Sequence, residues 1–125
     1  MRILFLSRYQ FPYITSGGTG VVVYELMNEF KHLGHTVAHW TWNSKGRKTK
    51  MSVEGMVGFS PIADVGSRNL KISTLSDIHA TGLSMMARFD QVNPFDVVHV
   101  HTWEMFLVAI MAKYFWKTPC LSVVS

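Results

Sequence analysis

The stretch ILFLSRYQFPYITSGGTGVVVYELMNEFKHLGHTVAHWT, residues 3–41, decides the fold. It opens with a short apolar run, residues 3–7, which is typical of a strand buried on both faces of a parallel sheet. Apolar residues then recur at helical spacing, and Gly34 follows where glycine commonly ends a helix. Residues 36–41 read as a second strand, so the stretch predicts a right-handed βαβ unit. The apolar helical positions are Val23, Leu26, Met27, Phe30 and Leu33.

The middle of the chain is less regular. Residues 55–61, GMVGFSP, are the best candidate for a short third strand. A second helix is expected from about residue 75 to residue 90, although Gly82 weakens it because glycine is a poor helix former. Its expected apolar face consists of Leu75, Ile78, Met86 and Phe89.

The last third of the chain returns to the opening pattern. Residues 96–100, DVVHV, form another buried apolar run, and residues 103–116 are long enough for a helix. A final strand is expected after Pro119. Strands that alternate with helices predict an α/β fold, namely a Rossmann-like doubly wound parallel sheet in one domain, residues 1–125.

The helix expected over residues 103–116 is apolar nearly all round, with only Glu104 and Lys113 charged. A helix of this kind is usually buried on most sides, and a small domain has little material to cover it. We therefore expect the 125 residues to be a piece of a larger protein.

Composition and charge narrow the function classes. The chain is 48% hydrophobic and 16% charged, which is typical of a globular protein. Its net charge of +4 comes partly from one basic run, residues 45–50. That run is expected to be a solvated loop, although such loops also contact anionic lipid at a membrane surface. Nucleic-acid binding is not predicted, because the chain has no basic helix and no interleaved aromatic residues.

Cys120 is the single cysteine, so no internal disulfide can form. This favours a reducing, cytoplasmic setting. The apolar run at the N-terminus is too short for a signal peptide, and no segment reaches the roughly 20 apolar residues of a membrane span.

Three glycines, Gly17, Gly18 and Gly20, stand at the start of the first helix. In an open parallel sheet the first strand-to-helix connection lies at the crevice where ligands bind. The first turn of a helix offers unpaired N–H groups that attract phosphate, and glycine lets the anion come close. The pattern lacks the third glycine of a dinucleotide fingerprint and has no Walker A lysine, so an ordinary glycine-rich turn fits it equally well.

The motif HVHTW carries a second set of candidate residues. His99 and His101 are two apart, so they share one face of the strand and lie at its carboxyl end. No third ligand is placed beside them, and a metal site is not predicted. We expect His99 to be structural and His101 to be exposed at the rim, where an imidazole can bond a ligand hydroxyl group.

Taken in order, these motifs resemble a known family. The segments MRILFLSRYQFP, SGGTGVVVYELMNEFKHLGHTV, FDVVHVHTW and KTPCLSVVS look like the N-terminal domain of retaining GT-B glycosyltransferases of the glycogen synthase and sucrose synthase type. The resemblance covers residues 1–41 and 95–125. It rests on the order and spacing of the motifs, each of which is modest alone.

The resemblance implies two facing Rossmann-like domains with the active site in the cleft between them. Residues 1–125 would be the acceptor-side domain, and the C-terminal donor-binding domain would be absent from this chain. The resemblance places the loop with Gly17 and Gly18 near the diphosphate of a UDP- or ADP-sugar donor, beside the third candidate Gly20, and it makes His101 a contact of the transferred sugar. It implies no metal or further cofactor, and a carbohydrate or lipid-linked acceptor.

Catalysis by the isolated chain is not expected. In the family that the chain resembles, the E-x7-E element and the Arg/Lys pair belong to the C-terminal domain, and nothing here supplies them. Two positions also depart from the bacterial glycogen synthase pattern, which has lysine where Thr15 stands and aspartate where Thr102 stands. A glycosyltransferase of another acceptor class fits as well.

Two other functions remain open at this point. A nucleotide-sugar epimerase uses the same two-domain architecture, and Glu104 near His101 hints at its acid/base chemistry. A stand-alone α/β module would instead dock a partner through the apolar helix over residues 103–116.

Overall fold

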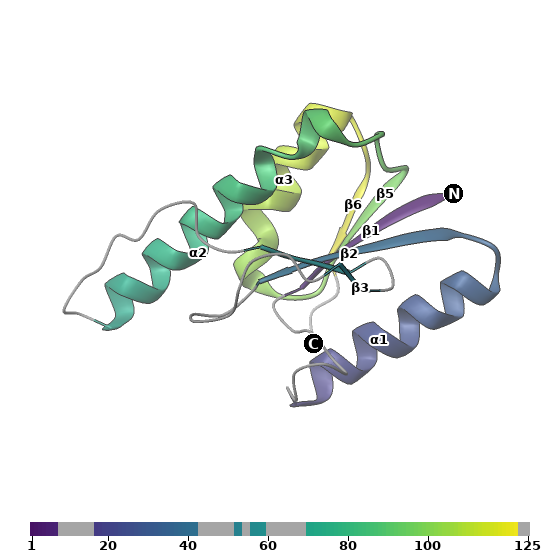
Figure 1. Cartoon of the computed structure of the whole chain (residues 1–125), viewed down its shortest axis with the longest axis horizontal. Coiled ribbons are helices and arrows are strands. Elements are labelled where there is room, and N and C mark those ends of the chain that lie inside the picture. Colours follow the sequence, from purple (N-terminus) through teal and green to yellow (C-terminus); the bar gives the residue numbers. More distant parts are fainter. Residues whose placement is uncertain (8–16, 43–51, 54–55, 60–69, 123–125) are drawn as a thin grey trace.

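The structure is a computed structural model that describes residues 1–7, 17–42, 52–53, 56–59 and 70–122 (Figure 1). Six strands and three α-helices follow one another in these ranges, with a short 3-10 helix before and after β5. In chain order the elements are β1 (Arg2–Ser7), α1 (Gly17–His32), β2 (Thr36–Trp42), β3 (Ser52–Val53), β4 (Met56–Phe59), α2 (Leu70–Met86), η1 (Phe89–Gln91), β5 (Val97–Val100), η2 (Trp103–Met105), α3 (Phe106–Trp116) and β6 (Cys120–Ser122).

The strands form one sheet in the order β3-β4-β2-β1-β5-β6. Every neighbouring pair is parallel except β3 and β4, which are antiparallel. From β1 the chain winds outward through β2 and β4, then returns to the other side of β1 for β5 and β6. The winding therefore reverses between β1 and β5, which confirms the predicted doubly wound α/β sheet. The short antiparallel edge strand β3 was not predicted.

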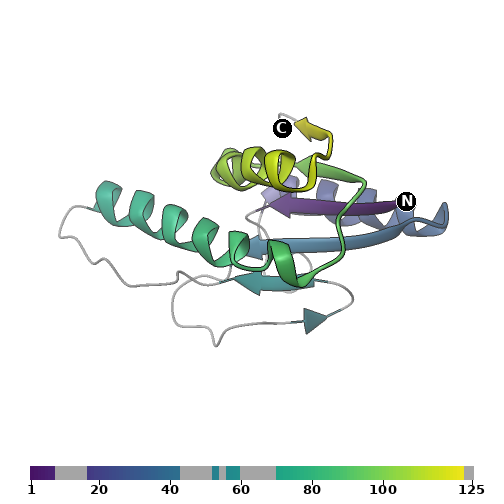
Figure 2. The same cartoon turned by 90° about the horizontal axis from the view of Figure 1, so that it is seen from above.

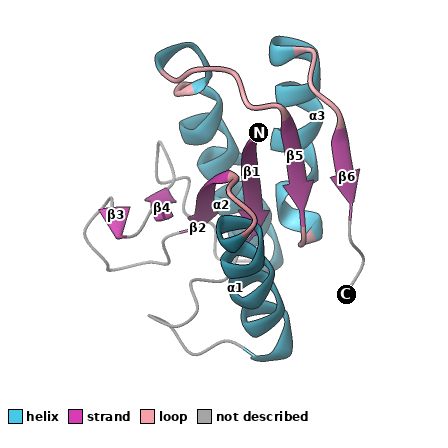
Figure 3. Ribbon diagram, turned by 90° about the vertical axis from the view of Figure 1, so that its right-hand side faces the viewer, coloured by secondary structure: helices cyan, strands magenta, loops and turns pink. Residues whose placement is uncertain are grey.

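Helices cover both faces of the sheet (Figures 1, 2 and 3). Helix α1 lies on one face, where Ile3 and Phe5 of β1 pack against its Val23 and Met27. Helices α2 and α3 lie on the other face, which receives Leu4 and Leu6 of the same strand. Successive side chains of a strand alternate between the two faces, so one apolar run serves both cores.

The core on the α2/α3 face is the larger one and is rich in aromatic residues. The ring of Trp40 lies 5.2 to 6.2 Å from four other aromatic rings, measured between centroids. These rings come from β4, η1, the segment before β5 and the end of α3, so Trp40 joins elements that are far apart in sequence. The four rings are Phe59, Phe89, Phe95 and Trp116.

The end of α1 confirms the prediction for Gly34. This glycine has a φ of +92°, and two hydrogen bonds close the helix end, from Gly34 N–H to Lys31 C=O and from His35 N–H to Phe30 C=O. The pattern is a Schellman motif, which favours glycine at the left-handed position. Leu33 was wrongly expected on the apolar helical face: it follows the helix and is 70% exposed.

Helix α2 differs from its expected form. It begins at Leu70 and ends at Met86, and Leu75, expected to face the core, is 57% exposed. The buried side includes Asp77 and Thr81, whose polarity hid it from an apolar-spacing argument. Gly82 lies at a close helix contact, because a Cβ there would stand 3.3 Å from the Val108 side chain on α3.

Helix α3 contacts the sheet along one side only. Val108, Ala109 and Ala112 are buried, whereas the outer face is exposed. The described part of the chain therefore leaves most of this helix uncovered, as expected of a small domain with little material to cover it. No helix in the described ranges combines the length and apolarity needed to cross a membrane. The exposed large apolar residues on α3 are Phe106, Leu107, Ile110, Met111, Tyr114 and Phe115.

Candidate functional site

The α1 face of the sheet changes from apolar to polar toward the carboxyl ends of its strands. On β1 the side chains on this face are Ile3, Phe5 and then Ser7, and on β2 and β5 Val37 and Val97 likewise give way to polar residues. These polar residues lie beside the point where the winding of the sheet reverses, which is where open α/β sheets bind ligands. We call this group the polar cluster: Ser7, His39, Thr41, His99 and His101.

Two histidines of the polar cluster are bonded to one another. Nδ1 of His99 lies 2.9 Å from Nε2 of His101, and both rings contact Phe5, with centroids 5.1 and 5.5 Å from its ring. The prediction that the two side chains share a face is confirmed. The other ring nitrogen of His101, Nδ1, is buried and has no hydrogen-bond partner among the residues that the structure describes.

The expected exposure of His101 was wrong, because the residue is only 3% exposed. It follows the last residue of β5, yet its backbone N–H still donates to the C=O of Leu6. The chain therefore stays on the sheet for one more residue, and the imidazole stacks on Phe5 at an interplanar angle of 17°.

Sequence reasoning missed the partnership of Ser7 and His39. Oγ of Ser7 lies 2.6 Å from Nε2 of His39, and both side chains are buried. Nδ1 of His39 has no hydrogen-bond partner in the described part of the chain. The signal was present in TVAHWT, because Val37, His39 and Thr41 alternate onto one face of β2.

Burial keeps these histidines neutral. It lowers the pKa of His39 to about 3, with smaller contributions from His101 and Lys31. Burial, together with His99, lowers the pKa of His101 to about 4, and burial also lowers the pKa of His99. Near neutral pH each ring therefore offers one N–H donor and one bare nitrogen acceptor.

The predicted glycines lie at the same end of the sheet as the polar cluster. Gly17, Gly18 and Gly20 form the first turn of α1, and the far end of α1 connects to the start of β2. The helix therefore runs antiparallel to the strands, and its N-terminus points toward their carboxyl ends (Figure 3). The first four N–H groups of a helix have no partner within the helix itself.

Residues 17–125 match the family model of the glycosyl transferase 4-like domain. The chain belongs to this family. Its structure is similar to that of sucrose-phosphate synthase from Thermosynechococcus elongatus, with a TM-score of 0.71 and 12% sequence identity. That match covers 97% of this chain and 32% of the other, so the chain spans about a third of that protein. No curated protein sequence matches it.

The comparisons confirm the GT-B type of fold and membership of a glycosyltransferase family. At 12% sequence identity, the structural similarity shows that the two proteins share a fold and shows nothing further about function. The glycosyl transferase 4-like domain thus has its polar cluster and the N-terminus of α1 at the end of the sheet where this fold class binds ligands.

The segment after His101 brings further polar groups to the same end of the domain. Thr102 is extended and buried, and Glu104 on η2 is buried as well. Trp103, between them, is mostly exposed.

Thr15 and the basic run at residues 45–50 lie outside the described residues. Within the described residues no group of three or more His, Cys, Asp or Glu side chains could hold a metal ion.

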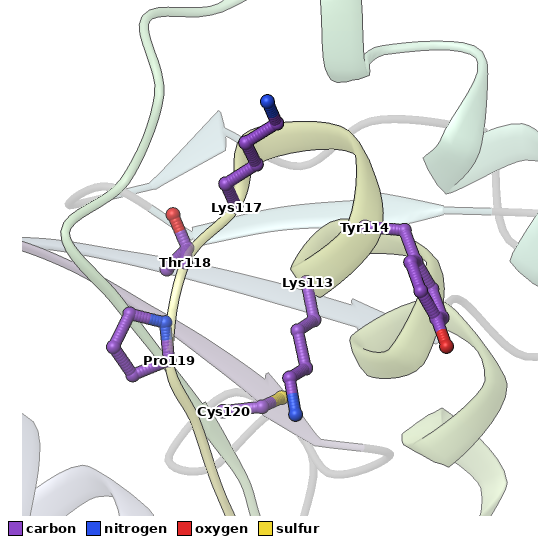
Figure 4. A pocket seen from close by; sticks show the side chains of 6 residues that line it. All are labelled: Lys113, Tyr114, Lys117, Thr118, Pro119 and Cys120. Atoms are coloured by element: carbon purple, nitrogen blue, oxygen red, sulfur yellow. The ribbon is translucent and has the colours of Figure 1, made fainter.

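A hollow of about 670 Å³ lies away from the polar cluster (Figure 4). It is formed where α3 ends and β6 begins, which is the amino end of the parallel strands. Its lysines stand in and just after the last turn of α3, where a cation complements the negative end of the helix dipole. We assign this hollow no part in sugar chemistry. Its lining residues are Lys113, Tyr114, Lys117, Thr118, Pro119 and Cys120.

Proposed function

We propose that this glycosyl transferase 4-like domain is the acceptor-side half of a retaining glycosyltransferase. The complete enzyme would move a sugar from a UDP- or ADP-sugar to a carbohydrate or lipid-linked acceptor, in a cleft between residues 1–125 and a donor-binding domain. One observation supports this most: a buried ring nitrogen of His101, which has no partner among the described residues, lies at the same end of the sheet as the N-terminus of α1.

The N-terminus of α1 suits the departing nucleotide. Negative charge grows on the diphosphate as its bond to the sugar breaks. Backbone N–H groups of Gly17, Gly18 and Gly20, together with the positive end of the helix dipole, stabilise that charge without reorganising. Stabilisation that is strongest in the transition state accelerates the reaction. No metal ion is needed in this proposal, because the helix end takes its place.

His101 suits a role in orienting the sugar. With a pKa of about 4 it is neutral at pH 7, and so it is a weak base that offers one N–H donor and one bare nitrogen acceptor. A neutral imidazole in a fixed position can exchange a hydrogen bond with a sugar hydroxyl group. Its burial against Phe5 holds the ring in one place. Correct placement of the sugar then contributes to the rate.

The acceptor class stays open within the proposal. The motifs resemble those of glycogen synthases, and a glycogen synthase-like activity is one candidate. Thr102, however, stands where the bacterial glycogen synthases have aspartate. Family membership favours transfer over an epimerase, although the buried Glu104 keeps a carboxyl group three residues from His101.

An interaction module is the second candidate function. The exposed apolar face of α3 favours it, because exposed apolar patches mark interaction sites. The two functions predict different results when His101 is changed, since His101 lies on the opposite face of the sheet from α3.

The test is a transfer assay on the complete protein with UDP- and ADP-sugars as donors. His101→Ala should lower kcat/KM about tenfold to hundredfold, the usual range for one positioned polar group. His79→Ala, on an exposed position of α2, is the matched control and should leave the rate unchanged. Equal rates for the His101→Ala variant and the unmodified protein, with the fold intact, would contradict the proposal.

A further inference from the structure

The bond between His99 and His101 determines which atom of His101 can meet a ligand. Nε2 of His101 is engaged by Nδ1 of His99 at 2.9 Å. The ring has only two nitrogens, so Nδ1 is the one left, and it is buried with no hydrogen-bond partner within the described ranges. A buried polar atom without a hydrogen bond is uncommon in a folded protein and calls for an explanation. A ligand group that bonds this nitrogen supplies one.

The same bond links the tautomers of the two rings. One nitrogen of the pair must carry the shared proton and the other must be bare. If Nε2 of His101 donates, then neutral His101 has a bare Nδ1 that accepts a hydrogen bond. If Nδ1 of His99 donates instead, then His101 carries an N–H at its unpartnered position. Buried N–H groups without an acceptor are rarer than under-satisfied acceptors, which favours the first arrangement.

We propose that His99 is a positioning residue: it accepts the Nε2–H of His101 and so keeps Nδ1 of His101 bare, as an acceptor for a hydroxyl group of the transferred sugar. The inference rests on the proposed function for the identity of the ligand. It adds the atom of His101 that is used, the polarity of its bond, and a reason for the first histidine of the motif.

This polarity also predicts specificity. A sugar hydroxyl group donates to Nδ1, so a donor sugar that lacks this hydroxyl group would leave the nitrogen without a partner. Sites built around a buried polar group discriminate against ligands that cannot satisfy it. Deoxy analogues of one nucleotide sugar should therefore fall into two classes, with a single position responsible for most of the loss in kcat/KM.

The first experiment reads the tautomer without any ligand. The complete protein is labelled with 15N in its histidine rings, and His101 is assigned by its absence from the spectrum of His101→Gln. We expect a protonated Nε2 and a bare Nδ1 between pH 6 and pH 8. A protonated Nδ1 would overturn the inference and would leave the proposed function standing.

The second experiment separates positioning from simple packing. Asparagine can place its Oδ1 near the position of Nδ1 of histidine, whereas leucine fills similar space and accepts no hydrogen bond. We expect His99→Leu to lower kcat/KM about fivefold to tenfold, the worth of one hydrogen bond, and to abolish the single tautomer of His101. His99→Asn should keep kcat/KM within about twofold of the unmodified value and should keep the single tautomer of His101.

His79→Leu is the control for adding an apolar side chain, and it should change neither kcat/KM nor the tautomer of His101. If His99→Leu keeps full activity and the same tautomer of His101, the inference is wrong. If instead His101→Ala transfers sugar at the unmodified rate, the proposed function fails, and the tautomer spectrum still decides whether His99 positions His101.

Discussion

The two faces of the central sheet are built from the same strands and differ in kind. On the α2/α3 face, side chains such as Leu4, Trp40 and Val98 belong to one buried apolar cluster. On the α1 face, a smaller apolar cluster around Phe5 gives way to the polar cluster of serine, threonine and three histidines. The difference arises from alternate residues of the same strands, so neighbouring positions in the sequence have unlike roles.

This comparison separates stability from recognition. An aromatic core has many packing contacts to lose, and changes there should act on the free energy of unfolding. A polar cluster with unpartnered ring nitrogens costs stability and should act on binding and on pH dependence. The predictions below test that division, beginning with the largest expected effect.

The strongest test of the α2/α3 face is Trp40→Ala. Trp40 packs against four aromatic rings, and its truncation should lower the free energy of unfolding by about 3 to 5 kcal/mol. Urea unfolding measures this directly. Trp103→Ala is the control, because Trp103 is mostly exposed, and it should cost under about 0.5 kcal/mol. Similar losses in the two variants would show that the aromatic cluster is not the main core.

The polar cluster should make the domain sensitive to acid. His39 and His101 have folded-state pKa values lowered to about 3 and about 4, so the unfolded chain binds protons more readily. Stability should therefore be complete above the unfolded pKa near 6.5 and fall as pH drops from there toward 4. For a single histidine the slope reaches about 1.4 kcal/mol per pH unit.

His39→Gln isolates the histidine contribution from that of the carboxylates. Glutamine can still bond Ser7, but it takes up no proton between pH 4 and pH 6.5. Unfolding free energies of both proteins at pH 7 and pH 5 should show a smaller loss in the variant. Equal losses would mean that His39 is not held neutral by the fold.

A smaller effect is expected at the end of α1, the helix that covers the polar cluster's face. Gly34→Ala places a Cβ on a residue with a φ of +92°, where glycine is favoured, and should cost about 1 kcal/mol. Space is not the cause, since a Cβ there meets no atom within 4 Å. Gly34→Asn, which tolerates this conformation better, should cost less, and equal thermal stability of all three proteins would contradict the helix-end account.

The sequence predicted those parts of the fold that local patterns determine. The apolar run of β1, the spacing in α1 and the glycine at its end act over a few residues each, and together they predicted the βαβ unit. The inner face of α2 could not be found in this way, because Asp77 and Thr81 lie on it; Thr81 bonds back to the C=O of Asp77, which satisfies its hydroxyl group.

The candidate site was predictable in its position and less so in its detail. The motif HVHTW placed two histidines on one face, and the structure confirms it. The burial of His101 depends on Phe5 and on a hydrogen bond to Leu6, which are contacts across strands and beyond the reach of a local pattern. The part played by His39 likewise needed the parallel pairing of β1 and β2.

The central claim is that a nucleotide sugar binds at the carboxyl end of the α1 face. The most direct test is an NMR titration of the complete protein with a UDP- or ADP-sugar, following the backbone amides of Gly17, Gly18 and Gly20 and the ring nitrogens of His101. We predict that both sets of signals shift and saturate together. Shifts confined to the outer face of α3, with the glycine amides and His101 unmoved, would contradict the account.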